Sequence, residues 1–165
     1  RVYAVDRTFD RVEPDVRATP GIRWIASDFE EEGFLPEKAD LVWAHDSFQY
    51  AVNPMQTLAR WNRMMNNDAM LVMMIPQQVN YVYNRLTFKT EDYNYFNYTI
   101  NNLVYMLAVN GFDCRDAYFY RTYNHQWLYA AVYKSCDAMD PATTSWFDLA
   151  DKNLVNDSIK LSLDR

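Results

Sequence analysis

The chain has 165 residues, of which half are hydrophobic and 16% aromatic, and its formal net charge is −6. This length suits one domain with a real core, and the apolar content excludes intrinsic disorder. No block of Lys and Arg stands out, so we expect no nucleic-acid partner. Neither a run of about 18 apolar residues nor a signal-peptide pattern occurs, which predicts a cytoplasmic protein with no membrane span.

The few cysteines and glycines restrict the chemistry further. Cys114 and Cys136 are too few for a disulfide framework or a zinc cluster, and we expect both to be reduced thiols. The chain has only three glycines, so we do not expect a glycine-rich phosphate-binding loop. No metal-ligand spacing and no Ser/His/Asp order stands out, so no metal is predicted.

The first half of the chain alternates short apolar segments with polar connections. Strands are predicted at residues 2–5, 22–26 and 41–44, while residues 11–20 contain two prolines and are too broken for a full helix. A helix is expected over residues 53–67, since Pro54 suits its first turn and apolar residues recur at helical spacing. Residues 69–75 form a continuous apolar run, which is typical of a strand covered on both faces.

The second half predicts one helix and a hairpin. Residues 99–110 place Ile100, Leu103 and Leu107 on one helical face, and Gly111 suits the end of that helix. Strands at 117–123 and 126–133 would form a hairpin. From residue 137 onward the chain is polar and predicts either a peripheral helix near 147–154 or an interaction tail. We therefore expect a domain over 1–135 and a C-terminal extension over 136–165.

The order of these elements predicts the fold class. Three strands, a helix, a strand, a second helix and a final hairpin indicate an α/β fold, with a mostly parallel sheet and helices on its faces. The antiparallel hairpin at the end is the unusual part of this arrangement.

Two segments carry a resemblance to a known family. Residues 39–50, Ala-Asp-Leu-Val-Trp-Ala-His-Asp-Ser-Phe-Gln-Tyr, precede Asn53-Pro54, the first long helix and the strand at 69–75. The second helix ends in Asn110-Gly111-Phe112-Asp113 and leads to the hairpin. Over about residues 2–134 this pattern resembles the class I S-adenosylmethionine-dependent methyltransferases of the small-molecule type. The resemblance implies a Rossmann-like methyltransferase sheet, S-adenosyl-L-methionine as cofactor and methyl transfer to a small-molecule acceptor.

The chain departs from that family at its start. The family's first strand, with its Gly-x-Gly turn, is missing, and this strand would lie in mid-sheet between the strands at 2–5 and 41–44. Each buried unpaired backbone group costs about 1–3 kcal/mol, whereas a whole domain is stable by only about 5–15 kcal/mol. We therefore expect further residues before Arg1, or something else that fills the gap. Asn67-Asp68 replaces the family's Gly-Gly, a change that left-handed turn geometry tolerates.

The resemblance implies roles for three residues at the cofactor. Asp6 ends the first strand, where a carboxylate in a crevice at the strand ends can accept both ribose hydroxyls. Asp28 and Phe29 follow the second strand and would hold the adenine. The alternatives are a solvated strand-end carboxylate for Asp6 and a helix N-cap for Asp28.

The third strand is followed by His45, Asp46 and Ser47, where the resemblance places the methyl-transfer site. His45 is predicted to line the cofactor site and is the first candidate for the base that takes a proton from the acceptor. A loop histidine without a catalytic role is the alternative. Asp46, Tyr50 and Tyr93 are predicted substrate contacts, although a cap on the core is the favoured interpretation of Tyr50 and of Phe48.

Two further segments have open interpretations. An aromatic segment would form a pocket lid, a homo-oligomer contact or plain packing. The run Glu30-Glu31-Glu32 is expected to be a solvated turn. The aromatic segment comprises Tyr81, Tyr83, Phe88, Tyr93, Tyr95, Phe96 and Tyr98.

Two other classes of function compete with an active methyltransferase. A degenerate methyltransferase-like domain would serve as a structural or interaction subunit, which the missing glycine-rich turn favours. An NAD-dependent Rossmann enzyme would require a parallel final strand and a Tyr-x-x-x-Lys pair. No such pair occurs in the sequence, and the final hairpin argues against this third class.

Overall fold

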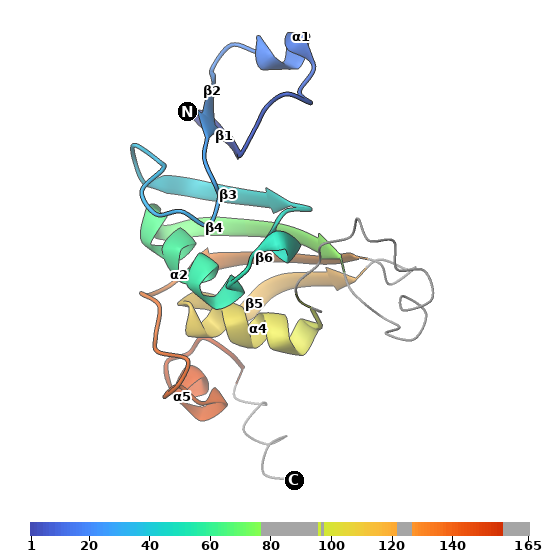
Figure 1. Ribbon diagram of the computed structural model, residues 1–165. Coiled ribbons are helices and arrows are strands. Elements are labelled where there is room, and N and C mark those ends of the chain that lie inside the picture. Colours follow the sequence, from blue (N-terminus) through green and yellow to red (C-terminus); the bar gives the residue numbers. More distant parts are fainter. Residues whose placement is uncertain (77–95, 97, 122–126, 157–165) are drawn as a thin grey trace, which may run out of the picture.

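The computed structural model describes residues 1–76, 96, 98–121 and 127–156, and its strands form two sheets (Figure 1). The smaller sheet pairs β1 with β2 in parallel, and the larger one has the order β3-β4-β6-β5. The strands are β1 (Val2–Asp6), β2 (Ile22–Ala26), β3 (Ala39–His45), β4 (Met65–Pro76), β5 (Phe112–Arg121) and β6 (Trp127–Lys134).

Helices connect and cover these strands, and polar side chains cap the two longest ones. Asn53 accepts a hydrogen bond from Gln56 N at the start of α2, where Pro54 occupies the first turn. Thr99 and Asn102 form a capping box at the start of α4. The helical elements are α1 (Pro14–Arg17), the 3₁₀ helix η1 (Phe48–Tyr50), α2 (Pro54–Met64), α4 (Ile100–Val109) and α5 (Trp146–Asp151).

The strand pairing confirms the α/β fold with a terminal antiparallel hairpin. β3 runs parallel to β4, whereas β6 runs antiparallel to both β4 and β5. The sheets are thus partly parallel and partly antiparallel. The predicted turn around Asn124-His125 lies outside the described residues.

The main core lies on one face of the four-stranded sheet. α2 contributes Leu58 and Trp61, α4 contributes Leu103 and Leu107, and all four side chains are buried. They pack in one cluster with inward-facing strand residues, and Figure 1 shows α2 and α4 together on one side of the sheet. The strand residues of this cluster are Ala44, Met65, Ala69, Leu71, Met73, Ile75, Phe112, Leu128, Ala130 and Val132.

Several element boundaries differ from the sequence prediction. α2 ends at Met64 and β4 already begins at Met65, because Met65 pairs with Ala39 across a bulge that precedes the regular register at Leu41. Asp68 adopts φ 61°, so the left-handed geometry expected at Asn67-Asp68 is confirmed for this residue. β5 likewise begins at residue 112 rather than 117, since its first residues pair with the end of β6.

The buried polar side chains of Asn62 and Lys134 connect the ends of α2, α4 and β6 by hydrogen bonds. Asn62 Nδ2 donates to the backbone oxygens of Asn110 and Cys136, both at 2.8 Å. Lys134 Nζ donates to Asn62 O at 2.9 Å and to Met65 O at 3.2 Å, which satisfies carbonyls at the end of α2. Burial lowers the pKa of the Lys134 ammonium, and Lys38 lowers it further.

The described residues after 136 pack against α4. Leu149 and Leu154 are buried with Ala108 and Val109 in a second cluster, and Cys114 N donates to Leu154 O at 2.8 Å. The division at 135/136 stays a prediction. None of the helices in the described part of the chain has the length and apolarity that a bilayer crossing requires.

Gly111→Ala tests the hydrogen bonds of Asn62 and Lys134 at the ends of α2, α4 and β6. Gly111 has φ +83°, and a Cβ there would lie 2.1 Å from Cys136 O, so the substitution combines a left-handed backbone with a backbone clash. We expect a loss of about 2–5 kcal/mol in the free energy of unfolding, measured by denaturant titration. Gly33→Ala is the matched control: Gly33 has φ +77° but nothing within 4 Å, so it should lose only about 1–2 kcal/mol. Equal losses would contradict this account.

Candidate functional site

The carboxyl ends of β1 and β2 bring two of the predicted cofactor residues together. Ser27 N donates to Asp6 O at 3.0 Å, so the chain leaves β2 beside the end of β1. The Asp6 side chain is exposed, and within the described residues its carboxylate has no hydrogen-bond partner. A free carboxylate at a strand end fits two neighbouring hydroxyl groups such as those of a ribose.

Asp28, unlike Asp6, is already engaged by its neighbours. Its Oδ2 accepts from Arg7 Nε at 2.9 Å and pairs with the guanidinium, while its Oδ1 accepts from Glu30 N at 2.9 Å. Burial raises the pKa of the Asp28 carboxyl, but the bonds from Glu30 N–H and Arg7 outweigh it, so the net pKa is lowered. Asp28 therefore keeps its negative charge to a lower pH than an ordinary aspartate does.

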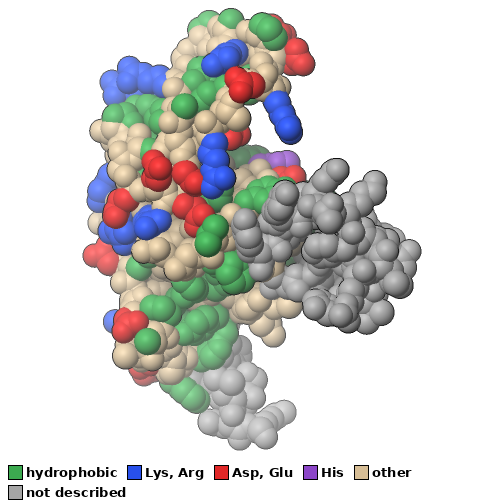
Figure 2. All heavy atoms as spheres, viewed as in Figure 1, with side chains coloured by type: hydrophobic (Ala, Val, Ile, Leu, Met, Phe, Trp, Pro, Cys, Tyr) green, Lys and Arg blue, Asp and Glu red, His purple; other side chains and the backbone are tan. Residues whose placement is uncertain are grey.

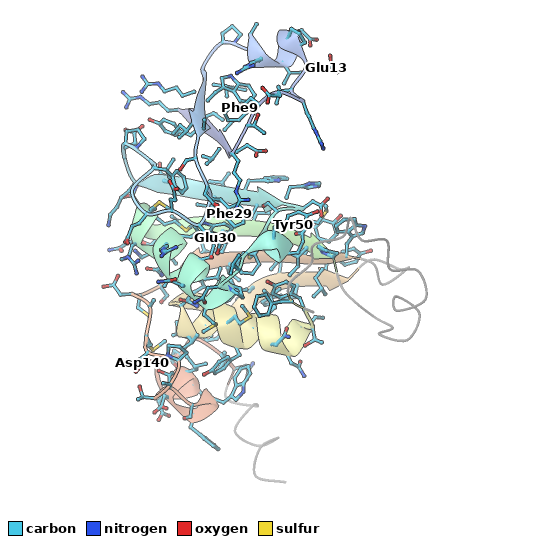
Figure 3. All side chains as sticks on the ribbon, viewed as in Figure 1. Phe9, Glu13, Phe29, Glu30, Tyr50 and Asp140 are labelled. Atoms are coloured by element: carbon cyan, nitrogen blue, oxygen red, sulfur yellow. The ribbon has the colours of Figure 1, made fainter. Side chains whose placement is uncertain are left out.

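Phe29 and Glu30 fix the segment after β2 to α2, as Figure 3 shows for the two labelled side chains. Trp61 Nε1 donates to Phe29 O at 3.0 Å, and the two rings meet edge to face with centroids 6.0 Å apart. Arg60 donates to Glu30 O. The Phe29 ring thus packs against the core, which leaves only part of it for contact with a ligand.

The Glu30 carboxylate makes most of the hydrogen bonds in this attachment. The prediction that Glu30-Glu31-Glu32 is a solvated turn is therefore wrong for Glu30. Its oxygens accept from Val52 N at 3.0 Å, from Asn53 N at 3.3 Å and from Thr57 Oγ1 at 2.8 Å. These donors stand at the start of α2, where the helix dipole also favours a negative charge. Glu30 is half-buried because the tertiary fold supplies three donors to it.

The other acidic residues of this run stay at the surface. Glu32 pairs with Arg63 at 2.6 Å, and both side chains are about half exposed. Figure 2 shows acidic and basic side chains interspersed over this part of the molecule. Such exposed pairs contribute little to stability.

The carboxyl end of β3 carries His45 and Asp46, both of them exposed. Asp46 adopts φ 50°, and its N–H donates to Met74 O of β4 at 2.9 Å. Gln49 Nε2 donates to Asp46 Oδ1 at 2.5 Å. These two bonds hold the Asp46 carboxylate at the strand end in a backbone conformation that non-glycine residues rarely adopt.

Gln49 and Glu30 are the site residues that sequence reasoning missed. Gln49 is only 1% exposed, and its Oε1 has no hydrogen-bond partner among the described residues. The only signal in the sequence was a polar Gln between Phe48 and Tyr50, which indicates neither its burial nor its contact with Asp46. Tyr50 itself is 42% exposed, and Figure 3 shows it toward the carboxyl end of β3.

The structure assembles the predicted residues into two groups. Asp6, Asp28 and Phe29 belong to the first, and His45, Asp46 and Tyr50 to the second. Between the two groups no hydrogen bond is present among the described residues, and β1 and β3, whose ends carry them, belong to different sheets.

Most of the aromatic segment lies outside the described residues, Tyr93 included. Phe96 is exposed, whereas Tyr98 is buried against Phe48, with ring centroids 5.5 Å apart. Within the described ranges the Tyr98 hydroxyl has no hydrogen-bond partner, and burial raises its pKa. In the described part of the chain no three His, Cys, Asp or Glu residues gather to hold a metal ion.

Comparison with known proteins agrees with this geometry. Residues 1–73 match a family described as a methyltransferase domain. No curated protein matches the chain. The solved structures described below share the fold at low sequence identity, and they are described as methyltransferases or putative methyltransferases.

Three proteins illustrate the structural likeness. The N-methyltransferase NodS of Bradyrhizobium japonicum is 12% identical, with 82% of this chain and 74% of that chain covered and a TM-score of 0.58, and a second NodS structure contains S-adenosyl-L-homocysteine. A putative methyltransferase of Bacillus halodurans is 12% identical over 82% of this chain and 83% of its own, with a TM-score of 0.66. A Haloferax volcanii putative methyltransferase in complex with the Trm112 activator is 13% identical over 81% and 72%, with a TM-score of 0.64.

The chain therefore has the Rossmann-like fold of these methyltransferases, as the resemblance in the sequence predicted, and residues 1–73 match a methyltransferase-domain family. The strand order and the antiparallel β6 distinguish this sheet from a dehydrogenase-type sheet, in which the final strand is parallel.

Glu30→Gln tests the attachment between β2 and α2. The amide keeps the shape of the side chain but removes the charge that faces the start of α2, so we expect a loss of about 1–2 kcal/mol in the free energy of unfolding. Glu31→Gln makes the same chemical change at an exposed neighbour and should cost less than about 0.5 kcal/mol. Equal effects in chemical denaturation would show that the Glu30 contacts contribute nothing specific.

Proposed function

We propose that the protein transfers a methyl group from S-adenosyl-L-methionine to a small-molecule acceptor. The observation that carries this proposal is the exposed carboxylate of Asp6 at the end of β1, which no described residue engages and which lies beside Asp28, in a chain with a methyltransferase fold. The cofactor supplies an electrophilic methyl group on a sulfonium, with S-adenosyl-L-homocysteine as the leaving group.

The first group of residues would hold the adenosine part of the cofactor. Asp6 would accept hydrogen bonds from the two ribose hydroxyls, and Asp28 would accept one from the adenine amino group through a carboxylate that Arg7 fixes at Oδ2 and Glu30 N–H fixes at Oδ1. Because the pKa of Asp28 is lowered, its carboxylate stays ionised near neutral pH. The exposed part of Phe29 lies beside the base.

The second group would orient the acceptor. Methyl transfer is an in-line displacement, so the protein chiefly positions the nucleophile and removes its proton where it carries one. Asp46 is oriented by Gln49 and by Met74 O, which makes it a fixed carboxylate for an N–H or O–H of the acceptor. His45 accepts the departing proton, and Tyr50, together with Tyr93, contacts the body of the acceptor.

One alternative has an observation of its own in its favour. The β1–β2 sheet is separate from the β3-β4-β6-β5 sheet, which is also what a methyltransferase-like domain with a structural or interaction role would show. Cofactor binding distinguishes the two functions, since a structural subunit has no need of it. We place the protein in the cytoplasm, without a nucleic-acid partner.

Calorimetric titration with S-adenosyl-L-methionine and S-adenosyl-L-homocysteine tests the cofactor site. Asp6→Asn should weaken the affinity about tenfold or more, because a charged acceptor of two hydroxyl groups is lost. Asp15→Asn changes a carboxylate on α1 and should leave the affinity unchanged. If the folded protein binds neither compound, the enzymatic proposal fails and the structural alternative stands.

His45→Gln tests the proton acceptor. With an acceptor that carries a proton, kcat should fall by about 100-fold to 10,000-fold, while the affinity for S-adenosyl-L-homocysteine changes little. Formation of S-adenosyl-L-homocysteine over a panel of amines, phenols and carbon acids would supply the rates. The other histidine of the chain, His125, provides the control variant His125→Gln. An unchanged kcat for His45→Gln would remove His45 from the mechanism.

A further inference from the structure

The amide of Gln49 leaves one buried hydrogen-bond acceptor without a partner. Gln49 lies on η1 between residues that are fully buried, Phe48 and Ala51, and its own side chain is only 1% exposed. Its Nε2 donates to Asp46 Oδ1 at 2.5 Å. A carboxylate only accepts hydrogen bonds, so the nitrogen of the amide must face Asp46 and the oxygen must be the other atom. Among the described residues nothing donates to this Oε1.

The unpaired oxygen lies next to the Asp46 carboxylate. The oxygen and the nitrogen of an amide are bonded to the same carbon, so Oε1 is close to the group that Nε2 contacts. A buried acceptor without a donor is costly, and the great majority of buried polar side chains in folded proteins have a partner. A site built around such a group selects a ligand that pairs with it.

Asp46 supplies a second acceptor and a negative charge. Its Oδ2 accepts no hydrogen bond from the part of the chain that the structure describes, and none of the ion pairs found there includes Asp46. Arg7, the basic residue after β1, is paired with Asp28 instead. The carboxyl end of β3 therefore presents two neighbouring acceptors, one of them charged, and no described cation is paired with them.

These two acceptors favour one class of ligand. A primary ammonium carries three N–H donors and a positive charge, so it can bond to both oxygens and compensate the charge of the carboxylate. A hydroxyl group offers one donor and no charge, so one of the two oxygens would stay unpaired. A carboxylate or a phosphate ester dianion has no donor, and the charge of Asp46 repels it.

We infer that the methyl acceptor is a primary amine, which binds as its ammonium to Asp46 Oδ2 and Gln49 Oε1. Because Oε1 is shielded from solvent without a ligand, the Gln49 amide turns about its terminal torsion, which has a broad energy minimum, to meet the ammonium. Tyr50 follows Gln49 and is 42% exposed, so its ring contacts an apolar body of the amine. The use of this amine site in catalysis rests on the proposed methyl transfer.

The bound amine must lose a proton before it can accept the methyl group. An ammonium nitrogen has no lone pair, so one N–H bond breaks and its proton passes to a ring nitrogen of His45, the residue before Asp46. The freed lone pair forms the new C–N bond while the C–S bond of the sulfonium breaks and its electron pair stays on sulfur. The products are a methylated ammonium and S-adenosyl-L-homocysteine, and His45 releases its proton to solvent.

Calorimetric titration with matched ligands tests the amine site. Each set shares one skeleton, hexyl or 2-phenylethyl, and its members differ in the head group: primary amine, alcohol, carboxylate or trimethylammonium. We expect the primary amine to bind at least about tenfold more tightly than the alcohol, which lacks the charge, and than the trimethylammonium, which lacks the N–H donors. The carboxylate should not bind detectably.

Two variants separate the charge of the site from its second acceptor. Asp46→Asn should remove most of the preference for the amine over the alcohol. Gln49→Met should remove most of the preference for the amine over the trimethylammonium, a change of about tenfold. A purely structural role of Gln49 would weaken both ligands alike. Gln56→Met, at an exposed position of α2, is the matched control and should change neither preference. The preferences of the unmodified protein decide the inference even if Gln49→Met fails to fold.

Three results would overturn the inference. The first is an alcohol or a carboxylate that binds as tightly as its amine, and the second is a folded Gln49→Met variant that keeps the full preference for the amine over the trimethylammonium. The third is failure of every amine to bind at millimolar concentration. If the protein binds S-adenosyl-L-homocysteine but no amine, the amine site fails and the proposed methyl transfer stands. If amines bind but yield no S-adenosyl-L-homocysteine from S-adenosyl-L-methionine, the amine site stands and the methyl transfer fails.

Discussion

The attachment of Glu30 to the start of α2 is the contact on which the candidate site depends. β1 and β2 carry Asp6 and Asp28, yet they form a sheet of their own. The carboxylate of Glu30, which accepts from Val52 N, Asn53 N and Thr57 Oγ1, connects the segment after β2 to the body of the protein. Hydrogen bonds from several donors to one half-buried carboxylate are strong and directional. They therefore fix the orientation of the segment after β2 as well as its distance from α2. Trp61, through Phe29, adds apolar contact to the same junction.

Strands and helices with strong local signals were predictable from the sequence. Residues 41–44 and 69–75 are continuous apolar runs, and Thr99 and Gly111 mark the two ends of α4. The first four residues of β4 were not predictable, because Met65 joins the sheet only through its pairing with Ala39 across a bulge. Local propensity contains no information about such a distant partner.

The site residues also divide into those that local sequence signals indicate and those that depend on distant contacts. Asp6, Asp28 and His45 were predicted because each follows a predicted strand and the family resemblance implies a role for it, and carboxyl ends of parallel strands form the usual ligand crevice. Glu30 was missed because its partners lie 22 to 27 residues further along the chain. Gln49 was missed because its role depends on the left-handed backbone of Asp46, which nothing in the residue types announces.

The proposed cofactor crevice depends on how the smaller sheet is held against the rest of the protein. Asp6 ends β1 of the smaller sheet, whereas Asp46 follows β3 of the larger one. Among the described residues, side-chain contacts at Glu30 and Glu37 connect these parts, and no strand pairing does. A ligand that contacts both carboxylates would favour the arrangement that brings both within its reach, and contacts that stabilise this arrangement would strengthen ligand binding by the same free energy. The attachment of the smaller sheet and the binding of the cofactor are therefore expected to be thermodynamically linked.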